Sequence, residues 1–137
     1  MKATVIQIAG GGFVGRSDSR HWATFDWGES NGGTNGAPTP MEMVLMALGS
    51  CSAIDIVSIL RKARTPAQDL RVELTAERRE EHPRIFTKIH MEYVVKGEGI
   101  KPSALERAIK LSEETYCSVS GMLHGNVEIT SSYRIEP

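Results

Sequence analysis

The stretch from Thr39 to Lys62 is the feature that most constrains the fold of this chain. Thr39 is a suitable N-cap, Pro40 suits the first helical position, and Glu42 can complete a capping box. No proline follows until Pro66, so the pattern predicts one helix of roughly 36 Å at 1.5 Å per residue. Its apolar residues cover every face, which is typical of a helix in the middle of a protein.

Cys51 lies at the centre of this predicted helix, among the small residues Gly49, Ser50, Ser52 and Ala53. Small residues allow other backbone to come close to a helix, or leave room for a ligand. A thiol at the midpoint of a buried helix is therefore the feature that a functional hypothesis must explain.

Composition narrows the classes of protein to consider. The 137 residues favour a single domain over 1–137, and a net charge of −1 with interspersed signs gives no electrostatic reason to expect a nucleic acid partner. The first apolar run is too short for a signal peptide, and Glu42, Cys51 and Asp55 interrupt the long helix, so we expect no membrane span. Two cysteines in a chain without a leader predict a cytoplasmic protein.

The remaining segments predict an α+β fold. Alternating apolar residues indicate short strands before the long helix and longer strands after it, and a glycine-rich loop over 28–38 leads into the helix. An amphipathic pattern from Lys101 to near Tyr116 indicates a second helix, and 118–123 suits one or two helical turns. The predicted order is β-β-β-α-β-β-α-β with mainly antiparallel sheet. The predicted strands cover 3–8, 21–27, 70–76, 85–95 and 127–135, and a further strand opens at 13–14. The strand over 85–95 would carry one inward face formed by Ile85, Thr87, Ile89, Met91, Tyr93 and Val95.

A helix that is apolar on all sides needs more cover than one small sheet provides. Either the second helix and the sheet wrap it together, or a second copy of the chain covers the remaining face. We expect a homodimer in which the two long helices pack near each other.

The two cysteines allow two interpretations. Free cysteine is among the most buried residue types, so Cys51 and Cys117 can be inert core residues. Alternatively, Cys117 lies where one helix has ended and a short one begins, and unpaired N–H groups there favour a thiolate. Cys51 and Cys117 would then form an attacking and a resolving thiol.

Several motifs together resemble one known family. The run 38–51, PTPMEMVLMALGSC, resembles the segment around the first cysteine of the OsmC/Ohr family, the osmotically inducible and organic hydroperoxide resistance proteins. The resemblance continues through DIVSIL at 55–60, the segment 77–89 and YCSV at 116–119. It covers nearly the whole chain and is closest to the YhfA-like branch of small bacterial proteins.

This resemblance implies an intertwined homodimer of OsmC-like fold with active sites at the subunit interface. It implies that Cys51 attacks an organic hydroperoxide and that its sulfenic acid condenses with Cys117. A dithiol reductant, dihydrolipoamide in the hydroperoxide resistance branch, would restore the thiols, and no cofactor is needed. The expected role is defence against oxidative stress.

The family also uses an arginine and a glutamate beside the attacking thiolate. Glu42 lies in the matching region, but nine residues of helix turn about 900°, which places it opposite Cys51, and its capping role explains it without catalysis. Arg16 and Arg20 precede the helix, and we take Arg20 as the candidate arginine, with Arg78, Arg79 and Arg84 as other candidates. Asp55 shares a helix face with Cys51, so we predict that an arginine, from this chain or from the other subunit, neutralises Asp55.

Two other functions stay open. A non-peroxidase module of the same fold would bind a small apolar ligand and would lack a cation for Cys51. A metal site would combine the thiols with histidines, but none of these has the short paired spacing of zinc ligands, so we expect no metal. The histidines are His21, His82, His90 and His124.

Overall fold

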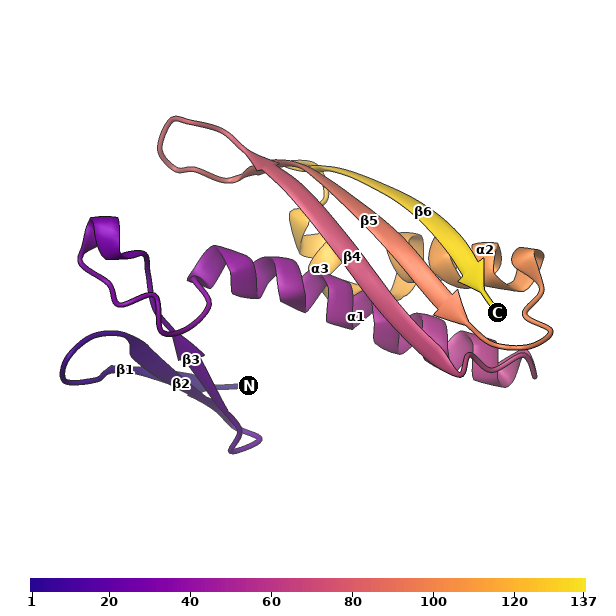
Figure 1. The fold of residues 1–137 in the computed structure, drawn as a ribbon, viewed down its shortest axis with the longest axis horizontal. Coiled ribbons are helices and arrows are strands. Elements are labelled where there is room, and N and C mark those ends of the chain that lie inside the picture. Colours follow the sequence, from indigo (N-terminus) through magenta and orange to yellow (C-terminus); the bar gives the residue numbers. More distant parts are fainter. The chain divides into compact units, whose positions relative to one another are not determined.

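The computed structural model describes residues 1–137, and their contacts divide the chain into two units, Met1–Leu45 and Met46–Pro137. The boundary falls inside helix α1 (Pro40–Lys62), the long helix expected from the sequence (Figure 1). The two units are described separately below. The expectation of one domain over 1–137 stays a prediction.

The first unit holds a three-stranded antiparallel sheet in the order β1-β2-β3. Gly10, Gly11 and Gly12 all have positive φ in the turn that follows β1, a conformation that residues with a Cβ rarely adopt. The apolar side chains of β1 lie on the surface of the chain: Val5 is 62% exposed and Ile6 is 50% exposed. The elements of this sheet are β1 (Ala3–Gln7), β2 (Phe13–Ser17) and β3 (Trp22–Phe25).

The glycine-rich loop after β3 is organised around the buried carboxylate of Asp26. This carboxylate accepts hydrogen bonds from the hydroxyl of Thr34 and from the N–H groups of Gly36, at 2.9 Å, and Trp27, at 2.8 Å. These donors, Thr34 foremost, lower the pKa of Asp26 to about 2. The loop, which contains a short 3₁₀ turn η1 (Glu29–Asn31), is therefore held by its own polar contacts and is more than a solvated connector.

The second unit consists of the sheet β4-β5-β6 and the helices that follow and precede its strands. Strands β4 and β5 are antiparallel, whereas β5 and β6 are parallel because helices α2 and α3 lie in the connection between them. The order β-β-β-α-β-β-α-β and the α+β class are thus confirmed. The elements are β4 (Asp69–Arg78), β5 (Phe86–Lys96), α2 (Pro102–Leu111), the π turn η2 (Ser112–Tyr116), α3 (Ser118–Leu123) and β6 (Glu128–Glu136).

The core of the second unit lies on one face of this sheet. Alternate residues of β5 point to this face and are buried, as are one stripe of α1 and the apolar face of α2. This alternation fits a sheet with one covered and one largely solvated face, although Val94 on the other face of β5 is also buried. The most completely buried apolar side chains are Leu48, Ile56, Leu60, Ile89, Met91, Val95, Leu105 and Ala108.

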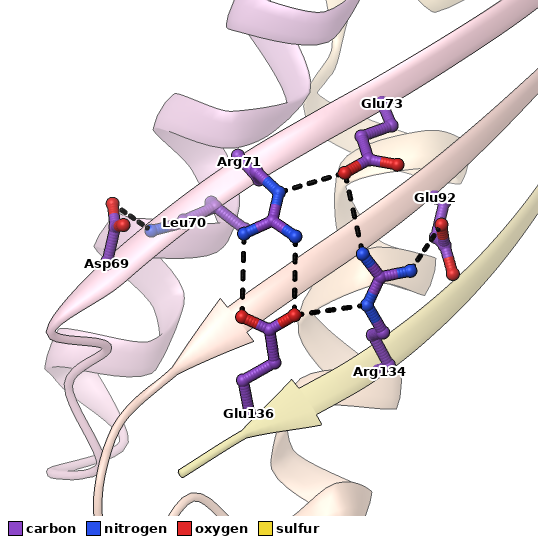
Figure 2. A network of polar contacts seen from close by, with 7 residues as sticks. All are labelled: Asp69, Leu70, Arg71, Glu73, Glu92, Arg134 and Glu136. Carbon is purple, nitrogen blue, oxygen red and sulfur yellow. Dashed lines mark hydrogen bonds and ion pairs between the residues drawn. The ribbon is translucent and has the colours of Figure 1, made fainter.

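The opposite face of the sheet carries a network of ion pairs that spans all three strands (Figure 2). Arg71 of β4 contacts Glu73 at 2.9 Å and Glu136 of β6 at 3.2 Å, and Arg134 of β6 contacts Glu92 of β5 at 2.8 Å. Exposed ion pairs contribute little individually, so this network matters mainly for strand register. The cysteines lie on the helices and turns, away from this network.

The predicted inward face of the second long strand is correct from Ile89 to Val95 but wrong at its start. Arg78 pairs with Phe86 whereas Glu77 pairs with Lys88, so the intervening threonine is an extra residue in β5. Such a bulge exchanges the faces of the residues beyond it. Phe86 is consequently buried, and Ile85, predicted to face the core, is 37% exposed.

Helix α1 approaches the sheet closely at Gly49. A Cβ placed on Gly49 would lie 2.8 Å from Cδ1 of Leu74 in β4, so the glycine permits this approach. The chain covers only one stripe of the helix: Ile54 is 70% exposed and Met46 is 47% exposed. By length and composition alone α1 is apolar enough to cross a membrane. A helix buried on all sides, as expected from the sequence, is therefore not produced by a single chain.

We predict that Gly49→Val destabilises the protein by about 1–3 kcal/mol, because the added side chain must displace Leu74. Ser50→Val is the matched control, since Ser50 is the next residue of α1 and is exposed, and we expect it to change stability by about 0.5 kcal/mol or less. Urea unfolding of both variants measures the difference. Equal stabilities would show that the helix and the sheet are not closely packed at Gly49.

Candidate active site

The second unit brings the two cysteines together. Cys51 lies on α1 and is half-buried, whereas Cys117 is only 5% exposed and lies between η2 and α3. Both are free thiols, and the neighbouring Cys51 is one of the influences that raise the pKa of Cys117. The juxtaposition of two thiols far apart in the sequence is the central geometric feature of this site.

The surroundings of Cys117 only partly match the expectation of a thiolate at a helix start. The N–H of Ser120 donates to Cys117 Sγ at 3.4 Å, so the sulfur does act as the N-cap of α3. Burial has the larger effect, and the neighbouring Cys51 adds to it, so the pKa of Cys117 rises to about 11. The N–H donors at the helix start do lower this pKa, as expected, but desolvation outweighs them, so the prediction of a favoured thiolate at Cys117 is wrong.

A π turn delivers the chain to Cys117. The N–H of Cys117 donates to the carbonyl of Ser112 at 2.8 Å, five residues earlier, where an α-helix would use Glu113. The sequence predicted an ordinary amphipathic helix to near Tyr116, but α2 ends at Leu111. Single π turns occur frequently at functional sites, and this one changes the direction in which Cys117 leaves the helix.

A chain of buried hydroxyl groups lies beside the cysteines, and we call it the hydroxyl chain. Tyr93 Oη lies 2.6 Å from Ser52 Oγ, and Ser52 Oγ lies 2.9 Å from Ser112 Oγ. Ser112 in turn donates to Asp55 Oδ2 at 3.0 Å. Tyr93, Ser52 and Ser112 are completely buried, so these bonds satisfy polar groups that have no access to water.

The direction of these bonds follows from the number of protons. An ionised carboxylate only accepts, so the single proton of Ser112 goes to Asp55. Ser52 must then donate to Ser112, and Tyr93 must donate to Ser52. Each of the three hydroxyl protons thus has an oxygen acceptor, and the Tyr93 hydroxyl also lies 3.8 Å from Met91 Sδ, a weaker acceptor.

Asp55 corrects an expectation from the sequence. Its observed partner is the hydroxyl of Ser112, and no lysine or arginine of the chain forms an ion pair with it. The prediction of an arginine partner is therefore wrong within the chain. The carboxylate serves as the acceptor that ends the hydroxyl chain.

Glu113 adds a second carboxylate to this region. Its Oε1 is buried and has no hydrogen-bond partner in the chain. Burial raises the pKa of Tyr93 most strongly, and the negative charges of Glu113 and Cys117 raise it further. Tyr93 therefore stays protonated and remains a donor in the hydroxyl chain.

Sequence reasoning missed the hydroxyl groups of this site, although a signal was present. Ser112 continues the apolar stripe of Leu105 and Ala108, and a serine in a core position of an amphipathic helix requires a buried partner. Ser52 was noted only as one of the small residues around Cys51. The partners themselves depend on the fold, because Tyr93 comes from a strand.

The other predicted site residues, Glu42 and Arg20, belong to the first unit. Glu42 Oε2 accepts from the N–H of Thr39 at 2.7 Å, and the N–H of Glu42 donates to Thr39 Oγ1 at 3.3 Å, which confirms the capping box. Arg20 occupies the turn before β3 with φ of 66°, and its N–H donates to the carbonyl of Ser17. Cys51 lies in the second unit, so a role of either residue beside it stays a prediction.

Other arginines have structural partners in the chain. Arg78, Arg79 and Arg84 donate to backbone carbonyls at the tip of the β4–β5 hairpin, and Arg16 lies over the ring of Trp22 at 5.5 Å. No three His, Cys, Asp or Glu side chains are arranged as metal ligands. The two thiols and the hydroxyl chain are thus the reactive and polar groups that the second unit brings together.

Comparison with known proteins shows to which family the chain belongs. Residues 33–132 match the model described as OsmC-like protein, so the chain belongs to the OsmC-like family. It is 50% identical to Protein YhfA of Escherichia coli K12 over 135 residues, which cover 98% of each chain.

Solved structures agree with this assignment. A hypothetical protein from Aquifex aeolicus VF5 is 33% identical with a TM-score of 0.80, over 99% of this chain and 97% of that one. An organic hydroperoxide resistance protein OsmC from Legionella pneumophila has a TM-score of 0.71 at 14% identity, over 97% and 96% of the two chains. The second likeness concerns the fold alone.

The raised pKa of Cys117 can be measured by alkylation. In the Cys51→Ser variant, we expect the rate of reaction of Cys117 with iodoacetamide to rise with a midpoint between the ordinary value of 9.0 and about 11. Burial keeps the pKa above 9.0, and loss of the Cys51 thiol removes a smaller contribution. The same variant in denaturant is the control, with a midpoint near the ordinary value. A folded-state midpoint at or below 9.0 would show that the N–H donors dominate.

Proposed function

We propose that this protein is a thiol-dependent peroxidase that reduces organic hydroperoxides, with Cys51 as the attacking and Cys117 as the resolving thiol. The observation that carries the proposal is the half-buried thiol of Cys51 beside the buried thiol of Cys117. Membership of the OsmC-like family and structural neighbours named as organic hydroperoxide resistance proteins support it.

The proposed chemistry uses only the two sulfurs and two co-reactants. The Cys51 thiolate attacks the terminal oxygen of the hydroperoxide, the O–O bond breaks, and the alkoxide takes a proton to leave as an alcohol. Cys117 then attacks the sulfur of the resulting sulfenic acid, and the hydroxyl leaves as water when the disulfide forms. A dithiol reductant of the lipoyl type is oxidised to its own disulfide as the two protein thiols are restored.

The different surroundings of the two thiols support this division of roles. The thiolate is the nucleophile, and a pKa of about 11 leaves Cys117 almost entirely protonated near neutral pH. Cys117 is also buried, whereas part of Cys51 is accessible. A peroxide from solution therefore meets Cys51 first, and Cys117 is protected until its partner has been oxidised.

The group that activates Cys51 is part of the proposal. Arg20 has no ion-pair partner in the chain, so its guanidinium is available for a thiolate or a carboxylate. The carboxylate of Glu42 is already engaged by Thr39, which lowers its pKa and keeps it ionised. We propose Arg20 as the activating cation and assign Glu42 a secondary role as its anionic partner.

A homodimer would complete the fold. The uncovered stripe of α1 contains Ile54, and beside it lies a groove of about 620 Å³ between α1 and the chain leading into β4. The exposed apolar residues of β1 form a separate surface in the first unit. Exposed apolar surface of this kind favours association, and a second copy supplies matching apolar surface. We propose a soluble, cytoplasmic homodimer.

One observation favours a second candidate function. No positive charge is among the main influences on the buried thiol, and no cation of the second unit pairs with Asp55. A module of the same fold that binds a small apolar ligand would need no activated sulfur. Enzyme assays separate this candidate from the peroxidase.

We expect the wild-type protein to consume cumene hydroperoxide in the presence of dihydrolipoamide, and Cys51→Ser to reduce the rate to the uncatalysed background. Ser50→Ala, an exposed change next to Cys51, should retain at least half of the activity. Loss of hydroperoxide is followed with a colorimetric assay. Turnover that survives Cys51→Ser would contradict the thiol mechanism, and an inactive wild type would favour the ligand-binding module.

Light scattering at micromolar concentration tests the homodimer. We expect twice the chain mass for the wild type, and about the chain mass for Ile54→Glu, because the new charge would be buried against the second copy. Thr75→Glu, on the exposed face of β4, is the matched control and should remain dimeric. A wild-type monomer would refute the proposal.

A further inference from the structure

The two segments that carry the cysteines are joined by a direct hydrogen bond between hydroxyl groups. Ser52 follows Cys51 on α1, and Ser112 is the first residue of the π turn that ends at Cys117. The hydroxyls of Ser52 and Ser112 are 2.9 Å apart, and the carbonyl of Ser112 accepts the N–H of Cys117 at 2.8 Å. A short path of one covalent neighbour and two hydrogen bonds therefore links the thiols.

We infer that the hydroxyl chain is a positioning device that aligns the segments carrying Cys51 and Cys117 for disulfide formation. This inference rests on the proposed function in one respect, namely that the two thiols act as a pair. Ser52, Ser112, Tyr93 and Asp55 are positioning residues, because none of them is bonded to a sulfur that reacts.

The hydroxyl chain holds α1 at two points. Ser52 and Asp55 both lie on this helix, three residues apart, and both bond to Ser112. Two contacts to one residue fix the rotation of the helix about its axis, whereas a single contact would allow it to turn. The rotation of α1 decides the direction in which Cys51 points, so this pair of bonds acts on the attacking thiol.

The other end of the hydroxyl chain is fixed to the sheet. Tyr93 lies in the core face of β5 and donates to Ser52, so a strand, a helix and the π turn meet at one serine hydroxyl. Because each proton is used once, a change at one member leaves a buried group of its neighbour unsatisfied. These hydrogen bonds therefore favour one particular alignment of β5, α1 and the π turn over others.

Apolar residues of similar size would hold these elements together without buried polar groups. Burying hydroxyls and a carboxylate is unfavourable unless every group is bonded, and the resulting geometry is more directional than apolar packing. A disulfide needs a narrow range of separations and a dihedral angle near 90°, so directional contacts suit its precursor. The narrow geometry that a disulfide requires accounts for the presence of the hydroxyl chain beside the two thiols.

A glutathione equilibrium measures the positioning without any peroxide. Oxidised glutathione takes two electrons from Cys51 and Cys117 and is reduced to two glutathione molecules as the protein disulfide forms. The equilibrium constant equals the effective concentration of one protein thiol for the other, relative to glutathione. The fraction of oxidised protein at a series of glutathione ratios is read by mass spectrometry after thiol alkylation.

We expect Ser52→Ala and Ser112→Ala to lower the effective concentration at least roughly tenfold, since small misplacements of reacting groups have large effects. Asp55→Asn retains an oxygen that accepts from Ser112, and we expect it to stay within about threefold of wild type, with Asp55→Ala lower than Asp55→Asn. The matched controls Ser50→Ala and Ser118→Ala remove exposed hydroxyls that directly neighbour Cys51 and Cys117. Both controls should match the wild type.

Tyr93→Phe keeps the inference testable if a serine variant does not fold. It removes only the terminal hydroxyl and preserves the ring in the core, and circular dichroism checks that the fold is intact. We expect a decrease of about threefold or more. Two results would overturn the inference: folded serine variants whose effective concentration is within twofold of that of Ser50→Ala, or a wild type that forms no disulfide. If the serine variants do not fold, a folded Tyr93→Phe whose effective concentration is within twofold of that of the wild type overturns it.

A second measurement separates this inference from the peroxidase proposal. With cumene hydroperoxide, the serine variants should oxidise Cys51 at a rate within about twofold of wild type but accumulate sulfenic acid, which dimedone traps. Absence of any peroxide reaction in the wild type refutes the peroxidase and leaves the glutathione result to decide the positioning. If dimedone traps equal amounts of sulfenic acid in Ser112→Ala and Ser118→Ala, the positioning role of the hydroxyl chain is refuted. The peroxidase proposal is then unaffected.

Discussion

The packing of helix α1 onto one face of the β4-β5-β6 sheet is the constraint on which the second unit depends. Gly49 permits the close approach to Leu74, and Cys51 and Ser52 follow two and three residues later in the same helix. The residues that face the sheet are then set by the helical period: Leu48, Ser52, Ile56 and Leu60 are all fully buried. A thiol next to the position of closest approach is held in place by the same contact that builds the core.

One position in this buried stripe, Ser52, is polar, and it determines which polar groups must lie around it. Ser52 lies among apolar residues and so requires partners from other elements, which Tyr93 and Ser112 supply. Those partners locate the π turn and, through it, Cys117. The pKa of Cys117 is then governed by burial in this core and not by the start of α3, which has only six residues. The same core packing that fixes the position of Cys117 also buries its thiol and keeps it protonated.

The fold was largely predictable because local patterns agree with the tertiary structure. The capping box at Thr39, the alternation in β4 and the stripe of α2 each follow from neighbours in the sequence. The π turn, the bulge in β5 and the parallel pairing of β6 were not predicted, because each depends on contacts between distant segments. The two thiols were found as candidates by residue type, whereas the hydroxyl chain was not, since serine and tyrosine in a core have no local signature. Within the chain, the partner of Asp55 is Ser112 and not the predicted arginine, for the same reason.

The position of Cys51 in the middle of a helix has a consequence for reactivity. Backbone N–H groups there are used by the helix itself, so they cannot stabilise a thiolate as those at a helix start do. The nearby hydroxyl protons are also committed, because each of the three makes one bond toward Asp55. A cation must therefore supply the stabilisation if the sulfur is to attack a peroxide, and the arginines of the second unit's hairpin already bind carbonyls. A cation supplied by a second copy of the chain would tie the proposed activity to the same association that would cover the exposed face of α1.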